Sequence, residues 1–381
     1  MPATQRRPLH FRITGKASVE RLEPLLLRRE WGTVTWATLQ DEAKAGVQSP
    51  CEAIAQDGVD IDFVWETTVT KEWRDLHRSA RVLNRLSGAQ VLEDKGSLAL
   101  LQRRMEVPTL KSHLLTGKSQ VAAWAEQRWG GQATVTAPGQ PAGEDVRDDW
   151  WALKVAGGNG GIDVWVLHSR NRHSILARLR DEEECCYVLQ RYVVRPLLRE
   201  GRKFHFRAYA ALRADLRAWL YRGAYLLAAS RPYDLDADEG AADDMVHISN
   251  LAVNKHTPGH PGQVPCDVVE DYPNLWPKMT ALLADLVQAA APFMAHQSNP
   301  HHFEFLGLDL IADESREVWL IEVNRLPGLQ SSSQNRVAED AFYNTMMAQL
   351  IDLLVVPPLR RRRQRGLRWQ RRRLLQTGSA R

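Results

Sequence analysis

Cysteine is scarce in this 381-residue chain, and long apolar runs are missing from it. Its four cysteines follow no spacing that is typical of a metal site, and they make too few pairs for a disulfide framework. An intracellular, reducing location in the cytoplasm is therefore expected. The first residues lack the apolar core of a signal peptide, and no apolar run reaches about 18 residues, so the sequence predicts neither export nor membrane insertion.

The positive charge of the chain is concentrated at its end. The formal net charge is only +4, but arginines crowd residues 360–373, with Trp369 among them. Residues 357–381 therefore predict a basic, disordered tail, which begins where Pro357 and Pro358 are expected to stop a helix. Such a tail can attract an acidic protein surface. A tail that only solubilises the chain or adheres to nucleic acid is the alternative left open.

The length allows two or three packed units with a sizeable core. The first 90 residues predict a small α/β domain, and helical patterns dominate Val91–Trp129. A segment rich in proline, glycine, threonine and alanine, residues 133–143, predicts a loop. The other expected elements are strands at Phe11–Ile13 and Ile61–Trp65 and helices at Val19–Arg29, Trp73–Leu86, Met279–Met294 and Glu339–Val355.

A glycine-rich turn lies between two predicted strands, residues 150–155 and 162–167. Glycines let backbone N–H groups surround phosphate oxygens, and Lys154 just before the turn adds a positive charge. The segment is typical of a loop that covers phosphates, although it matches neither the Walker pattern nor the dinucleotide fingerprint. A plain glycine-rich hairpin is the alternative. The glycines of the turn are Gly157, Gly158, Gly160 and Gly161.

A later strand has one cationic face. Lys203, His205 and Arg207 alternate with apolar residues, so their side chains point to the same side of the sheet. A row of cations needs an anion or water opposite, and a polyphosphate fits the first case. An exposed basic face is the alternative. Arg222, on the strand predicted over Leu216–Tyr225, is a further candidate cation.

Two apolar segments near residues 305–311 and 318–324 predict a hairpin that carries carboxylates. If its turn is centred near Ser315 and Arg316, Asp309 falls opposite Glu322, roughly 5 Å apart at Cβ. Facing carboxylates repel unless a cation lies between them, and oxygen donors of this kind suit Mg²⁺. A solvated polar face is the alternative. The side chains expected on the shared face are Gly307, Asp309, Ile311, Leu320, Glu322 and Asn324.

Taken in order, these motifs resemble the tubulin tyrosine ligase-like family, whose members have an ATP-grasp fold. The resemblance covers about residues 80–355 and is carried by WALKVAGGNGGI at 151–162, QRYV at 190–193, EGRKFHFRAY at 200–209, YRG at 221–223, HISNLAVNK at 247–255 and the hairpin sequences FEFLGLDL and WLIEVNRLPGL. It implies an α/β (α+β) architecture. The domains expected are a small N-terminal domain at 1–90, a central ATP-grasp domain at 91–194, a C-terminal ATP-grasp domain with an antiparallel sheet at 195–356, and the tail.

The resemblance also implies roles for single residues. Lys95, Lys154 and the glycine turn would contact ATP phosphates, and Lys203 would contact the nucleotide. Arg207 and Arg222 would meet the γ-phosphate and an acyl-phosphate formed from it. The remaining implied assignments are Gln190, Arg191, Tyr192 and Val193 to the adenine pocket, His247 and Asn250 to the border of nucleotide and substrate, and Asp309, Glu322 and Asn324 to Mg²⁺.

Two positions depart from the family pattern. His205 stands where the family usually has Asp, a position expected to bind the ribose, and Arg325-Leu326 stand where it prefers small polar residues. The implied activity is ATP-dependent addition of a free amino acid, namely tyrosine, glutamate or glycine, to tubulin, with a cytoskeletal location and no membrane or nucleic acid as partner. The alternatives are a catalytically weak or inactive tubulin-binding protein and a ligase for another protein.

Overall fold

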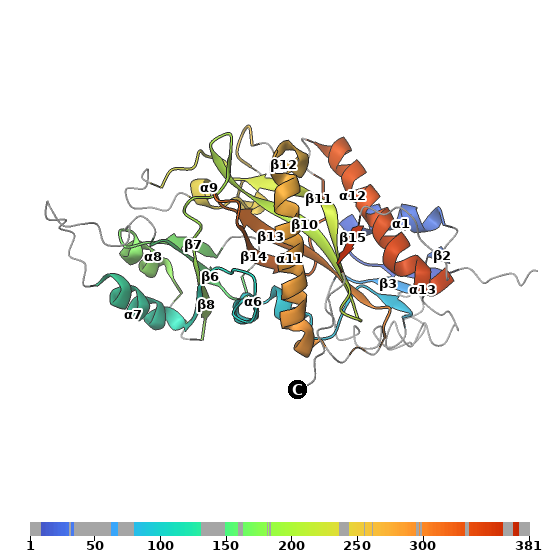
Figure 1. Cartoon of the computed structure of the whole chain (residues 1–381), viewed down its shortest axis with the longest axis horizontal. Helices are drawn as coiled ribbons and strands as arrows, with labels where there is room; N and C mark the ends of the chain where they lie inside the picture. Colours follow the sequence, from blue (N-terminus) through green and yellow to red (C-terminus); the bar gives the residue numbers. More distant parts are fainter. Residues whose placement is uncertain are drawn as a thin grey trace, which may run out of the picture.

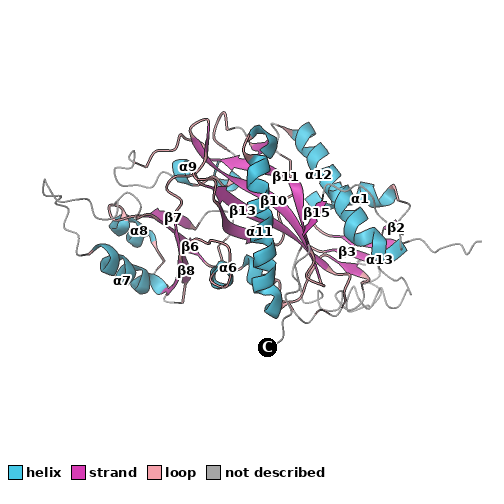
Figure 2. Ribbon diagram, viewed as in Figure 1, coloured by secondary structure: helices cyan, strands magenta, loops and turns pink. Residues whose placement is uncertain are grey.

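The chain forms a mixed α/β structure with three sheets, which lie one after another along the long axis (Figure 1). The mixed α/β class predicted from the sequence is confirmed. Figure 2 shows that helices lie over the sheets and at both ends of the long axis. The computed structural model describes residues 9–29, 32–33, 62–67, 80–130, 149–158, 163–180, 182, 184–235, 244–254, 256–260, 262–294, 297, 299–331, 335–360 and 369–372.

The N-terminal sheet has the order β2-β1-β3-β4, with parallel pairing throughout. Strands at 11–13 and 61–65 and a helix at 19–29 were predicted, and β1, β3 and α1 confirm them. The helix predicted over Trp73–Leu86 is wrong at its described end, where fully buried Val82 and Leu83 form β4 against β3. The elements are β1 His10–Ile13, α1 Lys16–Leu27, β2 Gly32–Thr33, β3 Phe63–Trp65 and β4 Val82–Leu83.

The second sheet has the order β5-β8-β6-β7 and is antiparallel. Helices were expected over Val91–Trp129, but β5 interrupts them, because this edge strand pairs with β8, which is distant in sequence. The loop predicted at 133–143 lies outside the described residues. The elements are α5 Gln90–Glu93, α6 Lys95–Gln102, β5 Ser112–Thr116, α7 Gly117–Trp129, β6 Trp151–Val155, β7 Val164–Leu167, α8 Arg172–Arg178 and β8 Cys186–Arg191.

The third sheet is antiparallel and has seven strands, with the order β12-β11-β10-β13-β14, while β9 pairs with β10 and β15 pairs with β11. Its strands are β9 Leu198–Arg199, β10 Arg202–Arg213, β11 Ala218–Ala228, β12 Gln263–Pro265, β13 Phe303–Ala312, β14 Val318–Asn324 and β15 Trp369–Arg372. Its helices are α9 Asp244–His247, α10 Leu251–Asn254, α11 Tyr272–Ala290, α12 Arg336–Leu350 and α13 Val356–Arg360, with short 3₁₀ segments at Cys266–Val268 and Ala291–Phe293.

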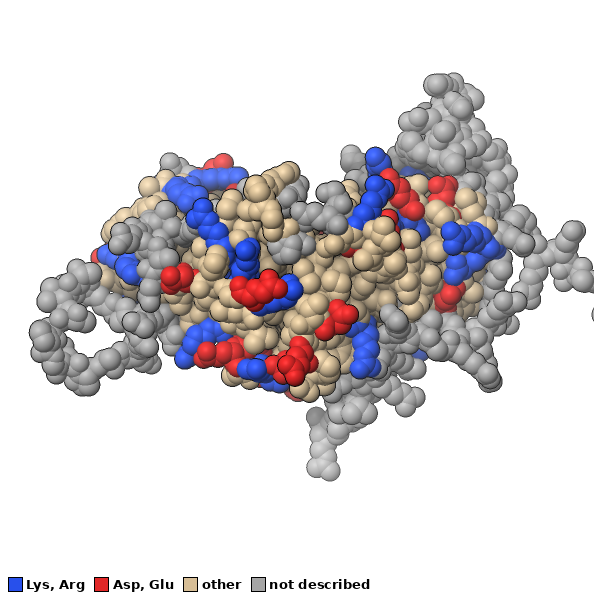
Figure 3. All heavy atoms as spheres, turned by 90° about the horizontal axis from the view of Figure 1, so that it is seen from above, with Lys and Arg blue, Asp and Glu red and all other residues tan. Residues whose placement is uncertain are grey.

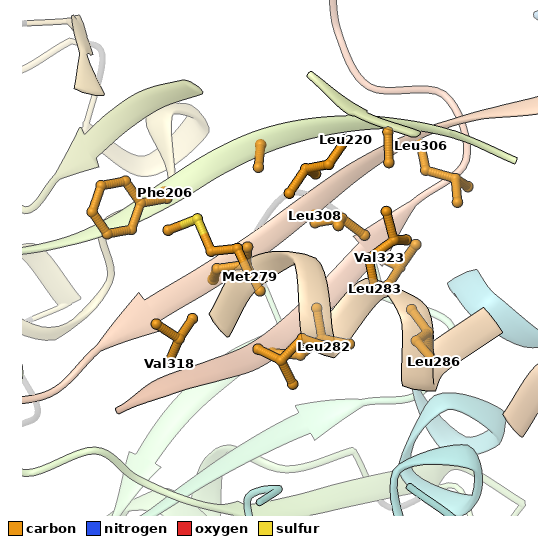
Figure 4. Close-up of a cluster of buried hydrophobic side chains, with 14 of the residues drawn as sticks. Phe206, Leu220, Met279, Leu282, Leu283, Leu286, Leu306, Leu308, Val318 and Val323 are labelled. Atoms are coloured by element: carbon orange, nitrogen blue, oxygen red, sulfur yellow. The ribbon is translucent and has the colours of Figure 1, made fainter. Parts of the chain in front are cut away.

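Both faces of this third sheet are buried. Leucines and a methionine of α11 pack against one face, as Figure 4 shows for Met279, Leu282 and Leu286. Helices α1 and α12 cover the other face around Tyr209 and Phe305. Burying a side chain of this size contributes about 1.5–3 kcal/mol. Strand β13 is consequently buried along its whole length, so any carboxylate on it needs a partner.

The C-terminal segment departs from the prediction at two places. The helix predicted over Glu339–Val355 was expected to stop at Pro357, but a π-helical turn at Ile351–Val355 leads into α13. Both prolines lie in α13 directly after the π-helical turn, so the helical backbone continues through them. A disordered tail is also wrong for Trp369–Arg372, because β15 pairs with the open edge of β11.

Within the described part of the chain, every helix is too short or too polar to span a bilayer.

Candidate functional site

A cavity of about 110 Å³, partly open to solvent, lies between the second and third sheets. Polar walls come from β6, β8, β10, the segment after α9, and the hairpin β13–β14, while apolar walls come mainly from β7 and the isoleucines of the hairpin. The lining residues are Leu110, Ala152, Lys154, Val164, Val166, Gln190, Arg191, Tyr192, Val193, Lys203, His205, His247, Ile248, Ser249, Asn250, Asp309, Ile311, Ile321 and Glu322.

The β13–β14 hairpin has the predicted register at its acidic residues. Asp309 pairs with Glu322, and the Asn324 amide lies 3.4 Å from the Asp309 carboxylate. A β-bulge follows, because Leu310 pairs with Leu320 and Ile321 is the extra residue. Leu320 was expected on the same face of the strand as Glu322, and this prediction is wrong. The bulge turns Leu320 into the core under α11, while Ile321 lines the cavity.

Arg207 lies across the sheet from Asp309 and binds both of its oxygens, with Nε–Oδ1 at 2.5 Å and Nη2–Oδ2 at 3.0 Å. Burial alone raises the pKa of Asp309, but the positive charge of Arg207 and the hydrogen bonds from Arg207 and Asn324 together hold the pKa below its usual value. Asp309 is therefore ionised, and Arg207, Asp309 and Glu322 form a row across three adjacent strands.

Three lysines bring positive charge to the same cavity. Burial lowers the pKa of Lys154 to about 8 against the opposing charge of Glu322, and Lys154 Nζ donates to Gln190 Oε1 at 2.8 Å. Burial, reinforced by Lys154, lowers the pKa of Lys203 to about 7. Lys95 lies 3.4 Å from Glu322 and also donates to the Gly158 carbonyl. Lys95 thus links the start of the glycine turn to the hairpin.

The glycine turn is described only in part. Gly157 and Gly158 follow β6, and the Gly158 N–H donates to the carbonyl of Val155 at 3.1 Å. Gly160 and Gly161, which were assigned to the phosphate-covering loop, lie outside the described residues.

The segment Gln190–Val193, which the resemblance assigns to the adenine pocket, joins the second sheet to the third and forms one end of the cavity. Asp149 fixes this end, since its carboxylate accepts hydrogen bonds from Arg191 at 3.1 Å and from the indoles of Trp129 and Trp151. Sequence patterns did not mark Asp149, because its partners come from separate elements.

His205 is buried and lies between the cationic and acidic groups. Its Nδ1 is 2.7 Å from Ser249 Oγ, and its Nε2 is 3.7 Å from Asp309 without a hydrogen-bond partner among the described residues. Burial lowers the pKa of His205 to about 4 despite the opposing effect of Asp309, so the imidazole is neutral at pH 7. Ser249 was not singled out, although it lies between His247 and Asn250, which were.

Two predicted residues lie elsewhere. Arg222 is exposed on β11 and is absent from the residues that line the cavity. Arg325, one of the departures from the family pattern, is buried, and its Nη2 binds Glu304 at 3.0 Å. Ala152 and Ile321, two residues of the apolar wall of the cavity, were not predicted from the sequence. Ala152 lies two residues before Lys154 and follows from strand alternation, whereas nothing in the sequence marks the bulge that places Ile321.

The residues fit a magnesium–nucleotide ligand. Five cationic groups, Lys95, Lys154, Arg191, Lys203 and Arg207, lie in or beside the cavity, and the described residues that line it include two carboxylates, so a polyanion would be attracted. His205 lines the same cavity, and its Nε2 has no hydrogen-bond partner among the described residues. Among the described residues no group of three His, Cys, Asp or Glu could hold a metal by itself. Two carboxylates and the Asn324 amide instead suit Mg²⁺, which takes its other ligands from phosphate and water.

Comparisons with known proteins agree with this geometry. A probable tubulin polyglutamylase TTLL9 of Bos taurus is 31% identical over 164 residues, 39% of this chain and 34% of that protein. The human tubulin polyglutamylase TTLL5 is 29% identical over 210 residues, 47% of this chain and 15% of that protein. A probable beta-tubulin polyglutamylase of Tetrahymena thermophila is 29% identical over 177 residues, 39% of this chain and 15% of that protein.

The chain thus spans about a third or less of the length of these curated relatives. The model of the tubulin-tyrosine ligase family matches residues 121–364, well over half of the chain. This range contains every residue that lines the cavity except Leu110. The chain belongs to the tubulin-tyrosine ligase family.

Proposed function

We propose that this chain is an ATP-dependent ligase that joins the amino group of a free amino acid to a carboxylate of tubulin. The names of its relatives, which are tubulin polyglutamylases, support glutamate as the amino acid and tubulin as the acceptor. We further propose that residues 91–194 and 195–356 are the two halves of an ATP-grasp fold, because the cavity lies between their sheets.

The proposed ligand positions follow the charges of the cavity. Lys95, Lys154 and Lys203 would hold phosphate oxygens, while Asp309, Glu322 and Asn324 would hold Mg²⁺. When bound, magnesium-ATP supplies the phosphoryl group that makes a carboxylate reactive toward an amine. The protein residues contribute orientation and charge neutralisation, which account for most of the catalysis in phosphoryl transfer. The partly buried Arg207, held by Asp309, adds a fixed positive charge at the same place.

One observation carries the proposal, namely that Lys154, Lys203, Asp309 and Glu322 come from four strands of two sheets and line one cavity. The test supplies the full chain with magnesium-ATP, tubulin, and radiolabelled glutamate, tyrosine or glycine in separate reactions. We expect label from glutamate to enter tubulin only when ATP and Mg²⁺ are present. Binding of magnesium-ATP without incorporation of any of the three would contradict a tubulin ligase.

A catalytically weak protein that binds tubulin is the second candidate, and His205 is the observation in its favour. A neutral imidazole with one nitrogen bonded to Ser249 offers a ligand a single polar atom, where the family's carboxylate would offer two acceptor oxygens. Tubulin binding with neither nucleotide binding nor incorporation would support this candidate.

The arginine-rich tail provides a separate prediction about tubulin binding. On the face shown in Figure 3, basic and acidic side chains of the described residues are interspersed, so this face has no field of one sign. Replacing Arg361, Arg362, Arg363 and Arg365 by Gln should weaken co-sedimentation with microtubules by about tenfold at low salt, and less as salt rises. The control changes four exposed arginines of the described surface to Gln, namely Arg178, Arg180, Arg195 and Arg231. Equal losses in both variants would show that net charge alone matters.

A further inference from the structure

A buried chain of hydrogen bonds runs through three residues of the cavity wall. Lys203 on β10 lies 2.8 Å from the hydroxyl of Tyr192, and its ammonium is 4.0 Å from the centroid of that ring. The same hydroxyl lies 3.0 Å from Nδ1 of His247, the last residue of α9. All three side chains belong to residues that are less than a tenth exposed.

Chemistry fixes the direction of the first of these hydrogen bonds. An ammonium has no acceptor, so Lys203 must donate to the Tyr192 oxygen. The single hydroxyl hydrogen of Tyr192 remains available for His247 Nδ1, which accepts it in the tautomer that carries its proton on Nε2. The His247 ring is held by Trp150, 5.6 Å between centroids, and by an edge contact with Tyr233 at 6.0 Å. The position of the His247 imidazole is therefore fixed by packing.

The surroundings of Lys203 show why these hydrogen bonds matter for its buried positive charge. The ionisable groups around this hydrogen-bond chain are Lys154 from β6, Tyr192 after β8, His205 on the same strand as Lys203, His247 from α9, and Tyr233, which lies beside Tyr192 and His247. Within the described residues, no carboxylate lies within 4 Å of the Lys203 ammonium. The Tyr192 hydroxyl and ring are thus the groups that offset the burial of this charge, by a charged hydrogen bond and by a cation–π contact.

We propose that Tyr192 and His247 are positioning residues that aim the Lys203 ammonium into the cavity and keep it protonated for binding of the nucleotide phosphates. The inference rests on the proposed function, because it takes the nucleotide as the ligand of Lys203. It assigns to the Tyr192 side chain a role distinct from lining the adenine pocket.

A dependence on pH follows. Burial and the charge of Lys154 lower the pKa of Lys203 to about 7. A bound polyanion favours the charged form, so affinity should be highest below this pKa and should fall as pH rises through it. Removing the Tyr192 hydroxyl takes away an acceptor that stabilises the ammonium. The pKa of Lys203 then falls further, and the decline in affinity moves to lower pH.

The test is calorimetric titration of the full chain with magnesium-ATP between about pH 6 and about pH 8.5. We expect Tyr192→Phe to weaken binding by about tenfold near pH 8 and by less near pH 6. His247→Leu should have the same effect, while His247→Gln, which retains an acceptor oxygen, should recover part of the affinity. Tyr187→Phe is the matched control, because this tyrosine lies on β8 and packs in the core of the second sheet.

The outcomes separate the two proposals. Wild-type protein that does not bind magnesium-ATP at any pH overturns the proposed function and this inference with it. Normal wild-type binding with an equal loss at every pH in Tyr192→Phe overturns the inference alone, because that pattern indicates lost packing. Should Tyr192→Phe fail to fold, the comparison of His247→Leu with His247→Gln tests the same proposal without changing the tyrosine.

Discussion

Glu322→Gln should reduce amino acid incorporation by at least about a hundredfold, equivalent to about 2.7 kcal/mol of transition-state stabilisation, without unfolding the protein. Glutamine has nearly the same size but carries no charge and replaces one oxygen by an amide. Glu322 faces Asp309 across the hairpin and lies 3.4 Å from Lys95. Its negative charge also raises the pKa of Lys154, so its loss leaves that buried lysine less protonated. The change therefore removes one of the proposed Mg²⁺ ligands and weakens the charge of Lys154, which is proposed to bind phosphate.

The matched control is Glu317→Gln, at the other end of the same hairpin. Glu317 pairs with Lys278 at 2.8 Å, and both side chains are at least a third exposed, so the pair should contribute little. Circular dichroism and thermal melting should show both variants folded, and incorporation should fail only in Glu322→Gln. Turnover retained by a folded Glu322→Gln protein would rule out the metal assignment.

The acidic hairpin and the cationic strand were predictable because strand alternation is local. A period of two places Lys203, His205 and Arg207 on one face, and a tight turn places Asp309 opposite Glu322. Those two rules define the cationic face and the acidic face separately, and only the resemblance to the family implied that both belong to one nucleotide site.

The errors arose where distant segments decide the structure. Strand β5 exists because β8 pairs with it, and β15 because β11 has an open edge, so neither is encoded by a local pattern. The bulge that exchanges Leu320 for Ile321 depends on how β14 is held by the core under α11. Arg325 likewise follows Asn324 in sequence, yet its partner Glu304 lies 21 residues away.

Glu304→Gln should lower the free energy of unfolding by about 3–5 kcal/mol, because it leaves buried cations without their counterion. Glu304 is fully buried on β13, where its carboxylate binds Arg85 at 3.1 Å, Arg325 at 3.0 Å and the Leu86 N–H at 3.0 Å. Burial lowers the pKa of Arg85 against the opposing charge of Glu304. Without that charge the two guanidinium groups repel each other between the segment after β4 and the end of the hairpin.

Urea unfolding followed by tryptophan fluorescence measures the change as a lower midpoint. Arg325→Ser should have a smaller effect than Glu304→Gln, because Glu304 then keeps Arg85 and the Leu86 N–H as partners. Glu314→Gln removes a carboxylate from an exposed pair with Arg195 and should leave the midpoint unchanged. If Arg325→Ser were as damaging as Glu304→Gln, the arginine would stabilise the hairpin by packing, and the carboxylate would not be the centre of the cluster. A large effect limited to Glu304→Gln would instead show that one buried charge joins the N-terminal sheet to the strand that carries Asp309.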